Sequence, residues 1–339
     1  MTALLADSEL GRVSAGVAAR AADLDEHRSD VRADLVELGR AGLLDLDLPA
    51  MVRVIDEISA HSLAVGFSTW AQHMTIRYLR AAGGDLGAQV RALASADRIG
   101  VTAMAAGLKQ VAGLAPVPIT AENDGADLLV SGPIRWASNV FPDALIVLPV
   151  RAGDRTLVVA VDAGAEGVTI DPAPPLTALG ATASTSLRLD RVRVPPRQVL
   201  TPDLDSFVAH IRPAFLLLQT AFCAGVTGAA LSAATRAHTG PLAQFGAELH
   251  GADQRAEAVR SRLYRWAGAP DTATVADLIR LRLHAATLAV DVTRLELALT
   301  GGAGYTLGSA ANRRFREAAF LPVQSPSEGQ LRWELTRYE

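Results

Sequence analysis

A tryptophan beside a small hydroxyl is the first chemical signal in the sequence. Trp136 and Ser138 belong to the pentapeptide Arg135–Asn139, which follows a Gly-Pro pair. An indole can lie against a flat ring, and a serine hydroxyl can form a hydrogen bond with the edge of that ring. The pair therefore predicts a site for a planar ligand on the lip of a β domain. If the pair binds no ligand, Trp136 is instead a core aromatic residue and Ser138 is a turn residue.

The stretch from residue 127 to residue 200 predicts that β domain. Apolar or alternating runs of strand length cover residues 128–130, 144–150, 157–161 and 186–194. Turn signals separate them at residues 131–133, 153–154, 164–167 and 172–175. Another strand is predicted at 100–104, ahead of a loop that contains Gly107 and Gly113.

Ala- and Leu-rich segments with helical spacing flank the β domain on both sides. The N-terminal side predicts helices over residues 10–25, 31–41 and 85–96, with one or two more over 51–82. The C-terminal side predicts helices over residues 203–211, 212–236, 242–266, 272–300, 310–320 and 328–337. Helices, then strands, then helices indicate an α+β chain. The predicted domains are 1–97, 98–202 and 203–339.

Composition excludes several classes of protein. Half of the 339 residues are hydrophobic and 20% are charged, which excludes a disordered chain and allows a substantial core. The net charge of −4 gives no reason to expect nucleic acid or an anionic membrane surface as a partner. Cys223 is the one cysteine, so the chain can form no internal disulfide and no cysteine-based metal site.

The stretch Pro213–Thr235 carries no charge, so its relation to a membrane must be considered. It contains the polar residues Gln219 and Thr220 and would be a single span, which favours a buried central helix of a bundle. Near the N-terminus, Asp7 and Arg12 interrupt any apolar segment of the signal-peptide type. We therefore expect a cytoplasmic protein with no membrane partner.

Several segments, in the right order, resemble the acyl-CoA dehydrogenase superfamily over almost the whole chain. The pentapeptide Arg135–Asn139 resembles the Trp-x-Thr/Ser-Asn turn of that family. Residues 179–185 and 190–195 resemble the end of its middle domain, and residues 301–305 with 313–317 resemble its Gly-Gly-x-Gly-Tyr turn and the Arg-Asp that follows. The resemblance implies an all-α N-terminal domain, a β-barrel-like middle domain and a C-terminal four-helix bundle.

The resemblance also implies FAD as the cofactor. In the family, the hydroxyl of the Trp-x-Thr/Ser turn bonds the edge of the flavin ring, so that role passes to Ser138 and Trp136 flanks the ring. Thr102 stands where the family has a threonine near the flavin. The family's serine that meets the FAD phosphate is replaced by Leu108, and its glutamine before the Gly-Gly turn is replaced by Ala298. These two changes weaken the implied site.

Three further residues are implied to contact the cofactor of a neighbouring subunit. Arg236 resembles the family arginine that meets the FAD pyrophosphate across a subunit boundary. Gly301 and Gly302 would let the backbone approach that cofactor closely. The resemblance thus implies a homodimer or homotetramer formed through the C-terminal bundle. Taken singly, these residues could equally be a surface charge and a helix break.

The position of a catalytic base is ambiguous. Dehydrogenation between the α and β carbons needs a carboxylate to take the α proton, and the family often has a glutamate in a Glu-Gly-Thr turn. Counting without a gap puts Ser325 at that position, and allowing three inserted residues puts Glu328 there. The first helix of the bundle offers no acid at residues 210–213, so Glu328 is the matching candidate. Its structural alternative is an acid in the first turn of a helix capped by Ser327.

Three functions remain open. The first is an FAD-dependent dehydrogenase for an acyl thioester carried on CoA or a carrier protein, with Glu328 as the base and an electron acceptor as partner. The second is a flavin-dependent monooxygenase of the same superfamily, which takes reduced flavin, for instance from a flavin reductase, and acts on a small molecule with oxygen. The ungapped Ser325 register favours this second function. The third is a repurposed relative with weak or no flavin binding, to which Leu108 and Ala298 point.

Overall fold

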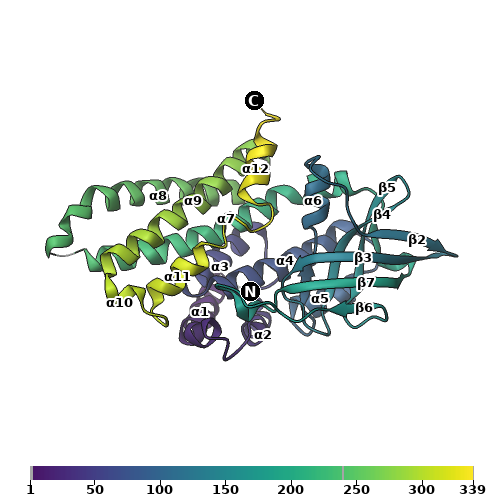
Figure 1. The fold of residues 1–339 in the computed structure, drawn as a ribbon, viewed down its shortest axis with the longest axis horizontal. Helices are drawn as coiled ribbons and strands as arrows, with labels where there is room; N and C mark the ends of the chain where they lie inside the picture. Colours follow the sequence, from purple (N-terminus) through teal and green to yellow (C-terminus); the bar gives the residue numbers. More distant parts are fainter. Residues whose placement is uncertain (1–2, 239, 339) are drawn as a thin grey trace.

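A computed structural model describes residues 3–238 and 240–338. Helices form one end of the molecule and a mixed β-sheet forms the other (Figure 1). The N-terminal helices are α1 (Ala3–Asp25), α2 (Arg32–Arg40), α3 (Leu48–His61), α4 (Leu63–Ala82) and α5 (Gly87–Ala94). The ranges of α2 and α5 lie within two residues of the prediction, whereas α1 begins at Ala3, earlier than the predicted start at residue 10. The segment 51–82 holds two helices, because Ser62 is extended and caps α4 by accepting a hydrogen bond from the backbone N–H of Val65.

The described residues of the middle region form one eight-stranded sheet. Its strands are β1 (Gly100–Thr102), β2 (Thr120–Asp124), β3 (Asp127–Ala137), β4 (Leu145–Ala152), β5 (Arg155–Asp162), β6 (Val168–Ile170), β7 (Thr185–Val194) and β8 (Val199–Thr201). The order is β6-β7-β3-β2-β4-β5-β8, and β1 pairs with β4 in parallel. Residues 145–150 of β4 are all buried, which explains the unbroken apolar run there. The segment predicted as a loop with Gly107 is instead the helix α6 (Ala105–Val111).

The turn predicted at residues 131–133 is wrong, because these residues continue β3. The pairing of β3 with β7 shifts register between Val130 and Gly132, which is the mark of a β-bulge. Gly132 has φ = 140°, and a Cβ at that position would lie 2.8 Å from Cα of Ile119. A Gly-Pro pair is compatible with a turn or a bulge, and here the close approach of Ile119 accompanies the bulge. The longer strand carries Trp136 to its far end.

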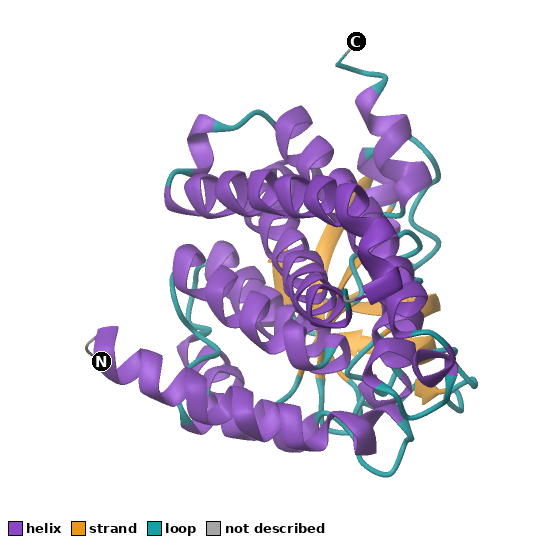
Figure 2. Ribbon diagram, turned by 90° about the vertical axis from the view of Figure 1, so that its left-hand side faces the viewer, coloured by secondary structure: helices purple, strands orange, loops and turns teal. Residues whose placement is uncertain are grey.

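The C-terminal helices are α7 (Leu204–Ala237), α8 (Gly246–Gly268), α9 (Val275–Thr300), α10 (Gly302–Tyr305), α11 (Ala310–Ala318) and α12 (Glu328–Leu335). Short 3₁₀ helices lie at Gly180–Thr182, Pro196–Gln198, Gly240–Phe245 and Pro270–Thr272. Seen from its helical end, the molecule is a bundle of helices with the sheet behind it (Figure 2). The predicted domain limits fall between α5 and β1, and between β8 and α7.

Helix α7 runs through the centre of the bundle and packs against α3, α4, α8 and α9. The prediction of separate helices over 203–211 and 212–236 is wrong, because Pro213 lies inside one continuous helix. Proline removes one backbone hydrogen bond from a helix, and the packing of α7 on its neighbours compensates for that loss. By length and composition α7 is the one described helix that could cross a membrane, yet 89% of its most apolar window is buried inside the protein. It is the central core helix that the sequence favoured.

A glycine permits the close crossing of α7 over α3. A Cβ on Gly225 would lie 2.1 Å from the carbonyl oxygen of Asp56 and 3.0 Å from the amide nitrogen of Ala60. We expect Gly225→Ala to lower the free energy of unfolding by about 1–3 kcal/mol, because the two backbones must move apart. Urea denaturation measures this, with Gly16→Ala as the matched control. A Cβ on Gly16 in α1 meets no atom within 4 Å, so that change should stabilise by about 0.5–1 kcal/mol. Equal effects of the two changes would contradict the role of Gly225.

Candidate functional site

Trp136 stands near the end of β3 as an exposed ring beside buried neighbours. Its side chain is part of a residue that is 46% exposed, whereas Ala137, Ser138 and Asn139 are buried. A large aromatic residue that keeps half of its surface open offers a free face to a planar ligand. The exposed face of Trp136 therefore fits the ring of a flavin. Because Trp136 is half exposed, it is not the core aromatic residue that the alternative interpretation of the sequence made it.

Ser138 is the first member of a chain of hydroxyl groups. Its Oγ lies 2.6 Å from Oγ of Ser184, which lies 2.6 Å from Oγ1 of Thr182, and Thr182 donates to the carbonyl oxygen of Leu179 at 2.7 Å. A carbonyl only accepts, so the proton of Thr182 is used there. Ser184 must then donate to Thr182, and Ser138 must donate to Ser184. Ser138 keeps free lone pairs and no free proton, so toward a ligand it acts as an acceptor.

Asn139 holds this turn against two other elements. Its Nδ2 donates to the carbonyl oxygens of Ser68 on α4, at 3.0 Å, and of Gly100 on β1, at 3.3 Å. Its backbone N–H donates to the carbonyl oxygen of Thr182 at 2.8 Å. With φ = 62° it adopts the left-handed conformation that asparagine tolerates better than most residues. Asn139 thus fixes where Ser138 lies.

Ser184 and Thr182 are site residues that the sequence analysis did not single out. They are 46 and 44 positions away from Ser138 in the chain, and only the fold brings the three hydroxyl groups together. The sequence signal that could have found them is the group of three hydroxyl residues Thr182, Ser184 and Thr185. It lies inside the segment 179–185 that resembles the family.

Thr102 lies at the end of β1, where the phenol of Tyr78 forms a hydrogen bond with its Oγ1 at 3.0 Å. Burial raises the pKa of Tyr78 above its ordinary value, so the phenol stays protonated even in alkaline solution. The side chain of Leu108 is buried in the core, and its backbone oxygen accepts a hydrogen bond from Nε2 of Gln330 at 3.2 Å. This position therefore offers no hydroxyl group to a phosphate.

The loop before α12 brings Ser325 against the central helix. The carbonyl oxygen of Ser325 accepts from Nε2 of Gln219, on α7, at 3.0 Å and from Nε2 of Gln324 at 2.6 Å. Arg282, on α9, is 1% exposed and donates to Oε1 of Gln219, to Oε1 of Gln324 and to the carbonyl oxygen of Leu321. The Oγ of Ser325 is buried and has no hydrogen-bond partner among the described residues.

Glu328 is the first residue of α12 and lies behind the cap residue Ser327. Its Oε1 accepts from Nε of Arg332 at 2.8 Å, and the side chains of Glu328 and Arg332 are 35% and 68% exposed. Ser327 accepts from the backbone N–H of Gln330, so the turn has the capping geometry of an ordinary helix start. The Glu328 carboxylate is thus engaged near the surface, and its role as a base stays a prediction.

Arg236, Gly301 and Gly302 lie away from Trp136 within one chain. The end of α7 and helix α10 are at the left of Figure 1, and the sheet is at the right. Arg236 donates to Oγ of Ser232 at 2.6 Å and lines an open cavity of about 410 Å³ between α7 and α8. A Cβ on either Gly301 or Gly302 would meet no atom within 4 Å. These three residues therefore lie at the opposite end of the molecule from the sheet that carries Trp136.

The described residues contain no group of three or more His, Cys, Asp or Glu side chains able to hold an ion, so they offer no candidate metal site. The candidate functional features are the exposed face of Trp136 and the acceptor hydroxyl group of Ser138 on the sheet, and the loop around Ser325 on the helical side.

No family model and no curated protein matches the sequence. Solved structures nevertheless match over almost the whole chain. A glutaryl-CoA dehydrogenase from Mycobacterium smegmatis in complex with FADH2 is 15% identical with a TM-score of 0.86, covering 99% of this chain and 96% of that chain. FkbI, described as serving the biosynthesis of a methoxymalonyl extender unit, is 21% identical with a TM-score of 0.83, covering 97% and 98%. The nitroalkane oxidase of Podospora anserina is 15% identical with a TM-score of 0.83, covering 99% and 95%. The chain has the acyl-CoA dehydrogenase fold.

Proposed function

We propose that this chain, which has the acyl-CoA dehydrogenase fold, is a flavin-dependent oxidoreductase that acts on a small molecule with oxygen, as a monooxygenase. We choose the monooxygenase over the dehydrogenase because of the side chains around the loop between α11 and α12. Glu328 pairs with Arg332 near the surface, and Ser325 is the residue held against α7. Among the structural relatives, the glutaryl-CoA dehydrogenase bound to FADH2 supports a flavin cofactor, and the nitroalkane oxidase supports a reaction other than acyl-thioester dehydrogenation.

The residues that would hold the flavin are Trp136, against the ring, and Ser138, at the ring edge. A bound flavin supplies two-electron transfer and, when reduced, reaction with oxygen. Because Ser138 acts as an acceptor, it suits a ring edge that carries an N–H group, as reduced flavin does at N5. Leu108 offers no hydroxyl group to the phosphate, which favours a flavin that exchanges over one that is held permanently. Both features support a protein that is supplied with reduced flavin by a flavin reductase.

Proton abstraction from an acyl α carbon is poorly served at the Ser325 loop. The side chains that meet there are the amides of Gln219 and Gln324 and the guanidinium of Arg282. None of these groups accepts a proton at neutral pH, and a serine hydroxyl without an adjacent base does not either. Acyl-thioester dehydrogenation would depend on Glu328 leaving Arg332 and turning inward.

The test compares two ways of turning over flavin. We expect the flavin-loaded protein to stay oxidised when butyryl-CoA or octanoyl-CoA is added without oxygen, and to consume oxygen when reduced flavin is supplied. Glu328→Gln should also stay oxidised with acyl-CoA and should consume oxygen within about twofold of the wild-type rate, because the proposal gives Glu328 no part in the reaction and the loss of an exposed ion pair costs little stability. An acyl-CoA dehydrogenase of the same fold is the positive control for bleaching.

Two outcomes would contradict the proposal in different ways. In the first outcome, an acyl-CoA bleaches the flavin of the wild type, and the rate of bleaching falls a hundredfold or more in Glu328→Gln. That result would establish the dehydrogenase with Glu328 as its base. No shift in the spectrum or fluorescence of either oxidised or reduced FAD would favour the repurposed relative without flavin.

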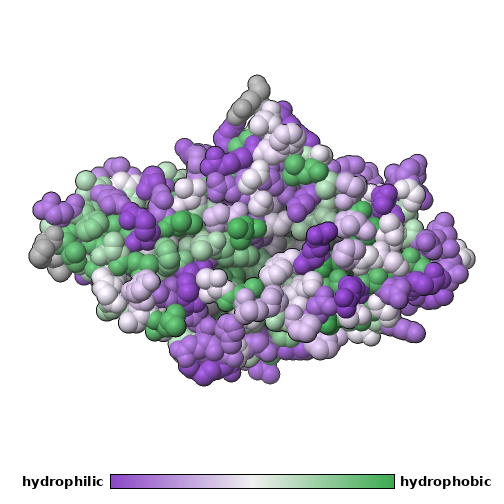
Figure 3. Space-filling view, in the orientation of Figure 1, coloured by the Kyte–Doolittle hydropathy of each residue, from purple (hydrophilic) through white to green (hydrophobic). Residues whose placement is uncertain are grey.

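We also propose that the active form is a homodimer or homotetramer joined through the helical half. Tyr305, Leu307 and Phe315 are exposed large apolar side chains on or near α10 and α11. A band of apolar surface runs along the helical half in Figure 3. Such an interface would bring Arg236 of one subunit toward the flavin of the other. Sedimentation velocity measures whether the protein is a monomer, a dimer or a tetramer. A monomer would count against both the interface and the shared cofactor site.

A further inference from the structure

Three hydroxyl groups run inward from the surface at the end of β3. We call them the hydroxyl chain: Ser138, Ser184 and Thr182, with 2.6 Å between each pair of neighbouring oxygen atoms. The exposed fraction of the residues falls from 7% at Ser138 to 0% at Thr182. At the inner end, the carbonyl oxygen of Leu179 accepts from Oγ1 of Thr182 at 2.7 Å and from the backbone N–H of Thr182 at 3.1 Å. Ser138 is therefore the member that a ligand can reach, two positions after the exposed ring of Trp136.

The backbone on both sides of Thr182 is strained. Leu179 has φ = 62° and Ala183 has φ = 47°, in the left-handed region that residues other than glycine rarely adopt. These two residues stand directly before and after the 3₁₀ helix Gly180–Thr182. The carbonyl oxygen of Thr182 accepts from the backbone N–H of Asn139 at 2.8 Å, which ties the strained segment to the turn after β3. Such strain persists where the surroundings fix it and is concentrated at functional sites, so it marks the inner end of the hydroxyl chain.

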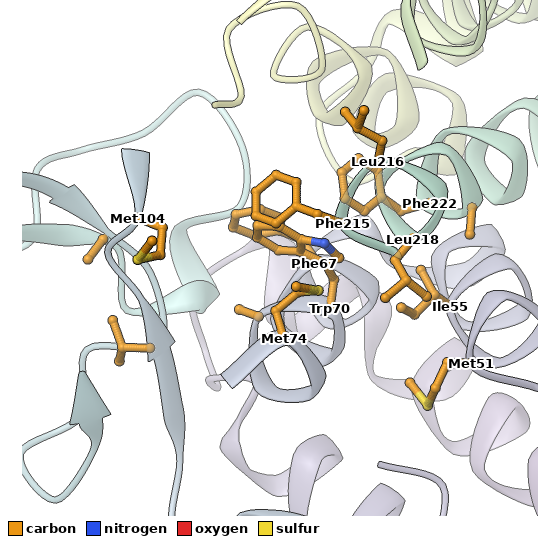
Figure 4. Close-up of a cluster of buried hydrophobic side chains, with 14 of the residues drawn as sticks. Met51, Ile55, Phe67, Trp70, Met74, Met104, Phe215, Leu216, Leu218 and Phe222 are labelled. Carbon is orange, nitrogen blue, oxygen red and sulfur yellow. The ribbon is translucent and has the colours of Figure 1, made fainter. Parts of the chain in front are cut away.

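The turn that carries Ser138 is anchored without the hydroxyl chain. Nδ2 of Asn139 donates to the carbonyl oxygen of Ser68, on α4, at 3.0 Å. Helix α4 is fixed in the core, where the ring of Trp70 meets the edge of Phe215 from α7 with centroids 5.0 Å apart. Figure 4 shows these two rings in the buried cluster between α4 and α7. The removal of one hydroxyl group from the hydroxyl chain should therefore leave the backbone of Ser138 in place.

The carbonyl group of Leu179 sets the direction of the hydroxyl chain. When Thr182 donates to that carbonyl, Ser184 donates to Thr182 and Ser138 donates to Ser184, so Ser138 offers a ligand only lone pairs. In the opposite direction Ser138 has a free proton, but the hydroxyl group of Thr182 must leave the carbonyl oxygen of Leu179. The reversal therefore costs one hydrogen bond. A ligand that donates to Ser138 keeps that bond, and a ligand that accepts from Ser138 loses it.

We infer that Thr182 and Ser184 are positioning residues that act through Ser138 and make the site prefer reduced to oxidised flavin. Reduction of a flavin by two electrons from an external reductant adds a proton at N5, which changes that atom from an acceptor to a donor. Only the reduced ring edge can therefore bond Ser138 without reversing the hydroxyl chain. This inference rests on the proposed function, because it takes Ser138 as the partner of N5. It goes further by naming the residues that set which oxidation state is held.

The experiment measures the affinity of the whole protein for oxidised FAD and for dithionite-reduced FAD, by calorimetry without oxygen. The wild type should bind reduced FAD more tightly. Ser184→Ala frees the proton of Ser138, and Thr182→Val lets Ser184 donate outward, so in both variants the oxidised ring edge gains a hydrogen bond without a reversal. The ratio of the two affinities should then fall about fivefold to tenfold, as expected for one hydrogen bond. For a two-electron couple this lowers the midpoint potential of the bound flavin by about 20–30 mV, which redox titration measures independently.

Two controls separate this role from a structural one. Thr182→Ser keeps the inner hydroxyl group and should keep the wild-type ratio. Ser138→Ala removes the residue through which the others act, so the addition of Ser184→Ala to that variant should leave the ratio unchanged. A substitution that only loosens the protein weakens the binding of both oxidation states together and does not move their ratio.

The outcomes distinguish this inference from the proposed function. If Thr182→Val and Ser184→Ala bind both forms of FAD with the wild-type ratio, the inference is overturned and flavin binding stands. If the wild type binds neither form, the inference and the proposed function are overturned together. If Thr182→Val does not fold, Ser184→Ala decides the question, because it removes a single oxygen atom.

Discussion

Arg212→Met is expected to lower the free energy of unfolding by about 3–5 kcal/mol. Arg212 on α7 forms an ion pair with Glu334 on α12, and the two side chains are only 5% and 12% exposed. Burial lowers the pKa of Arg212 despite the nearby carboxylate of Glu334, which shows how fully the pair is withdrawn from water. Removing the arginine leaves Glu334 buried without its partner, and a buried unpaired charge is costly.

Denaturant unfolding at neutral pH measures the effect, and α12, the helix of Glu334, offers a matched control pair. Arg332→Met removes the exposed pair with Glu328 and should cost less than about 1 kcal/mol. The double variant Arg212→Met/Glu334→Met should recover most of the loss, since it leaves no unpaired charge. Equal losses for Arg212→Met and Arg332→Met would contradict the prediction.

The second large effect is a fall in stability as the pH rises, caused by Glu317 on α11. Burial raises the pKa of Glu317 from 4.5 to about 7, with a smaller contribution from Asp25, while Arg313 and Arg314 act in the opposite direction. Between pH 4.5 and pH 7 the folded protein therefore holds a proton that the unfolded chain has released. The stabilisation is fully present below pH 4.5 and is lost by the time the pH passes 7, a change of about 3 kcal/mol.

Glu317→Gln should remove that dependence, because the amide does not titrate. Urea unfolding at pH 5 and pH 8 measures it: the wild type should lose about 2–3 kcal/mol more than the variant between the two pH values. Burial also raises the pKa of Asp34, to about 6, and lowers the pKa of His73, to about 4, and these two groups change the stability in opposite directions as the pH rises. The difference between wild type and Glu317→Gln therefore isolates the contribution of Glu317. Wild type and Glu317→Gln with the same slope would show that Glu317 is charged in the folded protein.

The order of helices and strands could be predicted from local signals. Ser62 and Gly301 end or begin helices through their own conformation, and the apolar run of β4 reflects burial on both faces. Local signals failed where a distant contact decides the outcome. The Gly-Pro pair at 132–133 continues a strand because Ile119 lies against it, and Pro213 is accepted within α7 because α3 and α9 pack around that helix.

In the candidate site, the residues that are neighbours in the sequence could be predicted, and the contacts between distant segments could not. Trp136 and Ser138 are two positions apart and matched a motif, so they were found together. Their supporting contacts span long stretches of chain: Ser184 is 46 positions from Ser138, and Gln219 is 106 positions from Ser325. The sequence alone left Ser325 and Glu328 as alternatives, since choosing between them requires the capping geometry of Ser327 and the pairing of Glu328 with Arg332.

The central position of α7 has a consequence for synthesis on the ribosome. Asp56 on α3 bonds Arg260 on α8 at 2.8 Å, and these residues are 204 positions apart. At elongation rates of roughly 5–20 residues per second, the apolar faces of α3 and α4 wait about 10–40 seconds before their partners emerge. During that interval the N-terminal helices can pack on one another and on β1, but the faces of α3 and α4 that pack on α7 stay uncovered, and chaperones bind exposed apolar surface of this kind. The bundle is thus completed only when the last part of the chain is made.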